Sequence, residues 1–107
     1  MKQRKKPREQ DDIIRELAAE AIRCGADMIE VEYDEGYEEV YVRKDNVGVS
    51  IDRFEASSPQ SLSLQKELYR LVKKKRRIVV DNVEYKLRAR VYESFGEDAF
   101  QVKWRRA

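Results

Sequence analysis

The sequence predicts an α+β domain in which a helix followed by three strands occurs twice. Apolar residues recur at helical spacing in two separate segments, and after each segment apolar and polar residues alternate as they do in half-buried strands. The turns that separate these strands are too short for parallel crossovers, so neighbouring strands in the chain should be antiparallel. We therefore expect two α-βββ units that form about six antiparallel strands, in one sheet or two, with both helices packed on one face.

Composition places limits on the class of protein. The 107 residues are enough for one domain with a modest core. Charged residues make up 41% of the chain, but the equally numerous apolar residues are well patterned, so a folded domain is expected rather than disorder. No apolar run approaches the roughly 20 residues that span a bilayer, so we expect no membrane span and a cytoplasmic location.

The inventory of reactive side chains is short. One cysteine and no histidine exclude a disulfide framework, a Cys/His zinc cluster and catalysis by a nucleophile–histidine pair. Neighbouring carboxylates, as in 30–32 and 38–39, have no evident acid, base or nucleophile beside them. We therefore expect no enzyme activity and no cofactor.

The chain begins with a basic segment and a first helix. Residues 1–10 are polar, basic and interrupted by Pro7, which predicts a flexible basic tail ahead of a single domain over 11–107. The tail either is simply solvated or binds an anionic partner. Asp11 or Asp12 is suited to cap the helix and Gly25 to end it. One helical face then carries the apolar residues Ile14, Leu17, Ala18, Ala21 and Cys24, so Cys24 is expected in the core rather than as a reactive thiol.

Three strands should follow this helix. The first covers residues 28–34, a Glu35-Gly36 turn comes next, and Asp45-Asn46 separates the second strand from the third. The alternation predicts that one face is apolar. The residues expected on that face are Ile29, Val31, Tyr33, Val40, Val42, Val47, Val49 and Ile51.

The second unit begins after a polar loop at 55–61. Ser58 and Pro59 suit the N-cap and the first position of a helix. This helix is expected to carry Leu64, Leu68, Leu71 and Val72 inward and to end in a basic patch, Lys73, Lys74, Lys75, Arg76 and Arg77. The patch is either a solvated helix end, whose cations suit the negative end of the dipole, or a binding surface.

The last strands contain the cleanest alternation in the chain. Ile78 and Val80 should face inward, and residues 83–91 alternate without interruption, so this strand is expected at the centre of its sheet. After a loop at 94–98, Phe100, Val102 and Trp104 should face the core. The outward positions include Lys86, Arg88, Arg90 and Lys103.

Two stretches resemble a known family. Residues 19–32 and 77–91, together with Gly96-Glu97 and the closing strand, resemble the domain that precedes the ATPase core in type II secretion and type IV pilus ATPases. That family has a helix, Gly-Ala-Ser-Asp-Ile-His and a strand, and later a hairpin that carries Leu-Arg. The resemblance covers residues 12–105. It departs where the family serine is absent, where Met28 follows Asp27, and where Glu30 replaces the family histidine.

The resemblance implies an accessory domain without its ATPase. None of the four glycines precedes a Lys-Ser/Thr pair, so the chain has no P-loop and should not hydrolyse nucleotide by itself. In the family, arginines of this domain reach phosphates held by the ATPase core. The matching positions in this chain are Arg88, which lies in the matching Leu87-Arg88 pair, and Arg90. The loop that follows differs in length from that of the family, so the alignment leaves the match of Arg90 open. Two such guanidiniums could clamp a phosphate or carboxylate. They could equally pair with outer-face acids such as Glu30 and Glu32.

Two functions remain. The first is a non-catalytic protein-interaction module that uses its open polar sheet face or an edge strand, with Arg88, Arg90, Lys86 and Lys103 as candidate anion- or partner-binding residues. The second is nonspecific nucleic-acid binding, because helix, three strands and helix is also the order of a double-stranded-RNA-binding domain, with the tail and the basic patch 73–77 as contacts. The acidic block 27–39 would oppose phosphate. The sequence leaves monomer and homodimer open.

Overall fold

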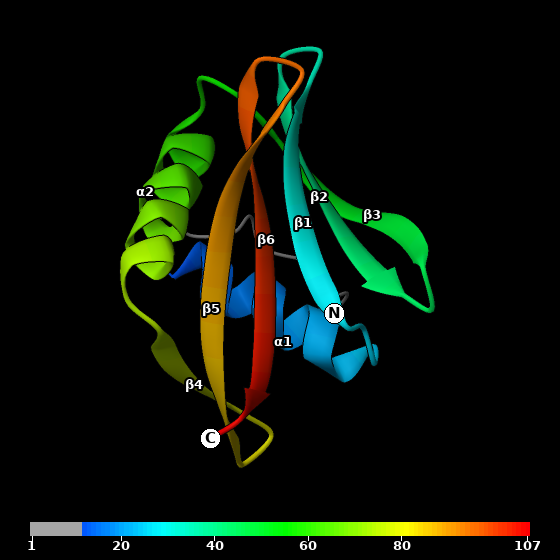
Figure 1. Cartoon of the computed structure of the whole chain (residues 1–107), viewed down its shortest axis with the longest axis vertical. Coiled ribbons are helices and arrows are strands. Elements are labelled where there is room, and N and C mark those ends of the chain that lie inside the picture. The colour runs from blue at the N-terminus through cyan, green and yellow to red at the C-terminus, as the bar shows by residue number, and fades with distance from the viewer. Residues whose placement is uncertain (1–11) are drawn as a thin grey trace, which may run out of the picture.

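A computed structural model of the chain describes residues 12–107, so the predicted basic tail 1–10 and the capping residue Asp11 lie outside the described residues. The first unit consists of α1 (Ile13–Arg23), β1 (Met28–Asp34), β2 (Tyr37–Lys44) and β3 (Val47–Glu55). The second consists of α2 (Pro59–Lys73), β4 (Arg76–Val80), β5 (Val83–Ser94) and β6 (Glu97–Arg106). The predicted α+β class and element order are confirmed (Figure 1).

The six strands form one antiparallel sheet with the order β3-β2-β1-β6-β5-β4. The two meanders meet where β1 pairs with β6, with Ile29 opposite Val102 and Val31 opposite Phe100. The central strands are therefore β1 and β6, as Figure 1 shows. The strand at 83–91, expected at the centre of its sheet, is an interior strand: β5 pairs with β4 on one side and β6 on the other, but it lies next to the β4 edge rather than in the middle. Its clean alternation reflects its length and the helix on one side of it.

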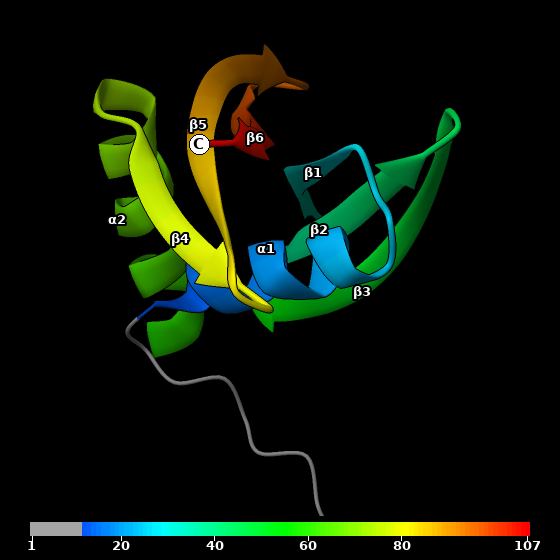
Figure 2. The ribbon, with the colours of Figure 1, turned by 90° about the horizontal axis from the view of Figure 1, so that it is seen from below.

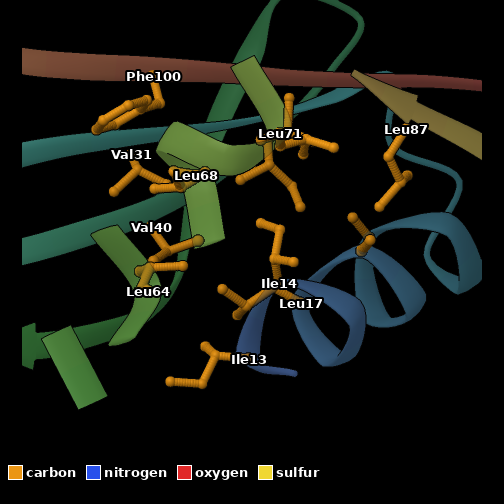
Figure 3. Packing of buried hydrophobic residues seen from close by; sticks show 14 of the residues in the cluster. Ile13, Ile14, Leu17, Val31, Val40, Leu64, Leu68, Leu71, Leu87 and Phe100 are labelled. Carbon is orange, nitrogen blue, oxygen red and sulfur yellow. The ribbon is translucent and has the colours of Figure 1, made fainter. Parts of the chain in front are cut away.

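Both helices pack on one face of the sheet, which we call the inner face. Figure 3 shows Leu64, Leu68 and Leu71 of α2 and Ile14 and Leu17 of α1 pointing into the same space as side chains of the sheet. Figure 2 shows the two helices beside the bent sheet, with α2 next to β5. The fully buried side chains of the sheet in this cluster are Ile29, Val31, Val40, Leu87, Phe100 and Val102. The opposite, outer face carries the polar residues of the alternation.

The first turn of α1 is capped from α2 rather than by a local aspartate. Asp12 stands at the N-cap with φ 60°, and its side chain makes no capping hydrogen bond; its carboxylate binds Arg76 instead. Glu67 Oε2 accepts a hydrogen bond from the Ile13 N–H at 3.2 Å, and Oε1 accepts one from the Ile14 N–H at 2.9 Å. Burial raises the pKa of Glu67, and these two hydrogen bonds act against that rise. Glu67 therefore joins the two helices.

The end of α1 follows the expected pattern but exposes the cysteine. Gly25 has φ +78°, its N–H donates to the Ile22 carbonyl, and the Ala26 N–H donates to the Ala21 carbonyl, which is a Schellman motif. The prediction that Cys24 lies in the core was wrong. Cys24 is the C-cap and is exposed, because the helix ends before its apolar face can continue, and Ala26 packs inward instead.

The third strand also differs from the prediction. Val47 and Val49, expected in the core, are 61% and 54% exposed. They lie on the inner side, where Val49 is opposite Val42, but β3 is an edge strand and neither helix covers this end of it. A bulge in β3 shifts the register, because Val40 pairs with Asp52 and Tyr41 with Ser50, which leaves Ile51 as the extra residue. Phe54, which the alternation did not assign to the core, is buried as a result.

Three acidic residues are unexpectedly buried. Glu30 and Glu39 lie on the outer face and are each 9% exposed, and Glu38 is 3% exposed. Tyr33, expected inside, is exposed. Glu38 lies opposite Phe54 and accepts a hydrogen bond from the Gln65 side chain at 2.5 Å, so it faces α2. Burial here depends on the local cover: α2 covers Glu38, side chains of neighbouring strands cover Glu30 and Glu39, and neither helix covers Tyr33.

The second helix is shorter than predicted. Ser58 caps it as expected, since its Oγ accepts a hydrogen bond from the Ser61 N–H at 3.1 Å, and Pro59 follows at the first position. The helix ends at Lys73, not at Arg77, because Lys74 already has an extended conformation (φ −147°). Arg76 and Arg77 belong to β4 and pair with β5. Trp104, expected in the core, is only half-buried at its margin.

Candidate functional site

The structure brings the four predicted site residues together on the outer face of β5 and β6. Arg88 lies directly opposite Lys103, and Lys86 lies opposite Arg105. Residues two apart on a strand share a face, so Arg90 lies beside Arg88 on β5 and is opposite Gln101. Arg105 was not among the predicted site residues. Its outward position follows from alternation, but its place opposite Lys86 depends on the β5–β6 register.

Two hollows lie among these side chains. One has a volume of about 170 Å³ and is lined by Arg88, Arg90, Gln101, Lys103 and the intervening Ala89. The other has a volume of about 290 Å³ and is lined by Lys75, Lys86, Arg88, Trp104 and Arg105. Because Arg88 lines both, we treat them as one surface and call it the cationic groove. No described residue that lines it is acidic.

The cationic groove contains two successive cross-strand pairs of like charge. Arg88–Lys103 and Lys86–Arg105 are directly opposed, an arrangement that destabilises a sheet because the cations repel each other. Among residues 12–107, no carboxylate forms an ion pair with any of these four side chains. The repulsion is thus not relieved by the described part of the chain. A bound anion would relieve it.

The other half of the outer face contrasts with the groove. Glu32 and Glu39 are also directly opposed like charges, on β1 and β2. Here, however, both have partners: Glu32 accepts a hydrogen bond from the Tyr92 hydroxyl at 3.3 Å, and Glu39 binds Ser50 and lies 3.5 Å from the Arg53 guanidinium. Burial raises the pKa of Tyr92 to about 12, and the charge of Glu32 adds to the effect. The carboxylates of this acidic pair therefore have hydrogen-bond partners within the chain.

A polar chain connects the two halves. Arg90 donates to the Gln101 side-chain oxygen at 2.9 Å, and the Gln101 amide donates to Glu30 at 3.3 Å. Glu30 also binds Arg43 at 2.5 Å. The sequence allowed these arginines to pair directly with Glu30 or Glu32. Arg90 instead reaches Glu30 indirectly, through Gln101. Arg88 has no such contact among the described residues. Arg90 is oriented by this chain, whereas Arg88 remains available.

The predicted basic patch 73–77 is spread over the end of α2, the connection to β4 and the start of β4. Lys73 ends α2, and Lys74 and Lys75 connect it to β4. Arg76 binds Asp12, and Arg77 lies 3.4 Å from Glu84. Of the five residues only Lys75 lines the cationic groove, whereas Lys74, Lys75 and Arg76 line a second cleft.

A larger cleft of about 480 Å³ lies between the start of α1, the end of α2 and β4. Its cations are Arg70, Lys74, Lys75 and Arg76. Its two carboxylates are already engaged, Asp12 with Arg76 and Glu67 with α1. Charge in this cleft is therefore mixed, and both of its carboxylates already serve contacts within the fold.

Comparisons with known proteins add no assignment. No family model and no curated protein matches the chain. No helix within residues 12–107 is both long and apolar enough to cross a membrane. Among the described residues, the cationic groove with its directly opposed cations is the candidate functional site.

Proposed function

We propose that this protein is a non-catalytic protein-interaction module that binds an acidic segment of a partner protein in the cationic groove. It would act like the accessory domain of a secretion or pilus ATPase present without its core. The observation that carries the proposal is the two pairs of directly opposed cations, Arg88–Lys103 and Lys86–Arg105, which have no ion-pair partner among the carboxylates of the described part of the chain.

The arrangement suits an extended acidic peptide. Side chains of the same face recur about every 6.6 to 6.8 Å along a strand, so Lys86, Arg88 and Arg90 form a row of positive charge. Arginine binds carboxylates through two parallel hydrogen bonds. An extended segment with acidic residues at alternate positions would match this spacing. Such an interface would form rapidly and weaken with salt.

A fluorescent 12-residue peptide of alternating glutamate and alanine provides a direct probe, and fluorescence anisotropy measures its binding. The double variant Arg88→Glu/Arg90→Glu should weaken binding at least about tenfold, because two attractive charges become repulsive. The matched control is Arg15→Glu/Lys66→Glu, which makes the same change of net charge at two exposed helix positions. Equal losses in both double variants, or no binding by the wild type at low salt, would contradict the proposal.

Nucleic-acid binding is the second candidate, favoured by one observation. Lys75, Lys86, Arg88 and Arg105 line one hollow of the groove, and a row of cations of this kind can follow the backbone of a single-stranded nucleic acid. The double-stranded-RNA-binding arrangement is less suitable, since β1 continues the sheet into β6. A labelled oligothymidine in the same assay separates the candidates: tighter binding than the peptide, lost in Arg88→Glu/Arg90→Glu, would favour nucleic acid.

A further inference from the structure

The free edge of β3 is open to strand pairing before its bulge. This edge strand carries Val47 and Val49, which are 61% and 54% exposed. The segment Val47-Gly48-Val49-Ser50 contains no charge and no proline, two of the devices by which proteins block such edges. The bulge at Ile51, a third such device, follows this segment and does not interrupt it. We propose that this edge pairs with β3 of a second copy of the chain, antiparallel and around a two-fold axis at Val49.

The backbone groups that point to the free edge can be identified. The Arg43 carbonyl accepts a hydrogen bond from the Asp27 N–H at 2.7 Å, so it points away from β3. Arg43 is opposite Gly48, and this pair is therefore one that exchanges no backbone hydrogen bonds. The N–H and C=O groups of Gly48 consequently point to the free edge, and so do those of Ser50, two residues further on.

A two-fold axis at Val49 places these groups opposite each other. Gly48 of one copy then faces Ser50 of the other, and the two exchange backbone hydrogen bonds. Val49 faces its own copy in a pair without backbone hydrogen bonds, in which the Cα atoms approach to about 4.5 Å. Gly48, Val49 and Ser50 are all exposed, so the described residues do not cover this part of the edge.

The side chains complement each other in the same register. Val47 lies on the inner face with Val49 and would come next to the bulged Ile51 of the second copy, which packs against the core. The exposed valines would thus cover each other and continue the apolar row of the core. Gly48 and Ser50, the small residues, meet on the outer face. The palindromic spacing of apolar and small residues favours a second copy over an unrelated strand.

The other edge of the sheet provides the contrast. β4 also exposes a valine, Val79, to 54%, but its first two residues are Arg76 and Arg77. An antiparallel pair of two β4 strands centred on Ile78 would place Arg77 opposite Val79, a charge against an apolar side chain. β4 is therefore protected by charge, and self-pairing is specific to β3.

Pairing of two β3 strands has a consequence for the outer face. It joins two six-stranded sheets into one, with both outer faces on the same side because opposed residues in a sheet share a face. The two cationic grooves would then lie at the far ends of one continuous surface. A repetitive anionic partner could occupy both and gain avidity. The pairing itself does not depend on what the grooves bind.

Sedimentation equilibrium of the full chain from roughly 1 to 500 μM, the range of ordinary homodimer affinities, tests the proposal. The mass should approach twice the 12.7 kDa of the chain. Val49→Asp should keep the circular dichroism spectrum and sediment as a monomer, and Val79→Asp, at an equally exposed valine of the other edge, should remain dimeric. A monomeric wild type, or dissociation by Val79→Asp as complete as by Val49→Asp, would overturn the proposal and leave the edge to a strand of another protein.

Cysteine crosslinking tests the register without relying on affinity. In a Cys24→Ser background, Val49→Cys should form a covalent dimer under mild oxidation, because paired Cα atoms about 4.5 Å apart suit a disulfide. Gly48→Cys should crosslink poorly, since Gly48 faces Ser50 and not its own copy, and Val79→Cys should form no covalent dimer. Crosslinking of all three at similar rates would indicate random collision and refute the two-fold pairing.

Discussion

Replacing Glu67 by alanine should remove the cap that α2 provides for α1. The wild-type carboxylate accepts hydrogen bonds from the Ile13 and Ile14 N–H groups at 3.2 and 2.9 Å. A hydrogen bond to a charged group contributes about 1.5–3 kcal/mol, and loss of an N-cap costs about 0.5–2 kcal/mol. Two facts reduce the net effect. Burial makes the charged form of the Glu67 carboxylate costly, and the substitution removes that cost. Glu67 also lines the adjoining cleft, through which water can reach the freed N–H groups.

We therefore expect Glu67→Ala to lower the free energy of unfolding by about 2 kcal/mol. For a domain of this size that corresponds to a decrease in Tm of roughly 8–16 °C. Urea denaturation followed by circular dichroism at neutral pH measures the change. Glu67→Gln, which keeps an acceptor oxygen but loses the charge, should cost about half as much.

The control is Lys66→Ala, an exposed neighbour on the same helix, which should change the free energy of unfolding by less than about 0.5 kcal/mol. If Glu67→Ala behaves like Lys66→Ala, the two hydrogen bonds contribute nothing to stability. The start of α1 would then be fixed by the packing of Ile13 and Ile14 alone, and the reasoning would be refuted.

Two other changes test local features of the fold. Ser58→Ala removes the side-chain cap of α2 and should cost about 1 kcal/mol of unfolding free energy, whereas the exposed Ser57→Ala should cost almost nothing in the same denaturation experiment. Burial raises the pKa of Glu38 in the folded protein, and its Oε2 has no hydrogen-bond partner among the described residues. The folded state therefore binds this proton more tightly than the unfolded state, and the penalty from Glu38 diminishes as pH falls toward the ordinary range of a glutamate. Glu38→Gln should be more stable than the wild type at pH 7 and lose that advantage near pH 4; an advantage that grows on acidification would contradict the assignment.

Much of the secondary structure follows from the sequence because its causes are local. The stop at Gly25 and the start at Ser58-Pro59 are decided within a few residues of each helix end. The turns at Asp45-Asn46 and Asp81-Asn82 have positive φ values at both central residues, as a two-residue hairpin requires. Alternation likewise separates the outward Arg88 from the inward Leu87.

The candidate site was only partly predictable. Alternation places Lys86, Arg88 and Arg90 on one face, but the opposition of Arg88 to Lys103 and of Lys86 to Arg105 depends on the β5–β6 register. The link of Arg90 to Glu30 through Gln101 requires, in addition, that β1 pairs with β6. No local signal encodes a contact between strands that are about 70 residues apart, as the separation of Glu30 from Gln101 illustrates.

By itself the sequence determined the elements, their order and the division of each strand into an apolar and a polar side. The tertiary structure decided which of those sides is covered. α1 stops before Cys24 and neither helix reaches the end of β3, so Cys24, Val47 and Val49 are exposed although their spacing predicted burial. Pairing of β1 with β6 made one sheet of two meanders and left β3 and β4 at its edges. Burial depends on what packs against a residue, and that is set by long-range pairing and helix length rather than by periodicity.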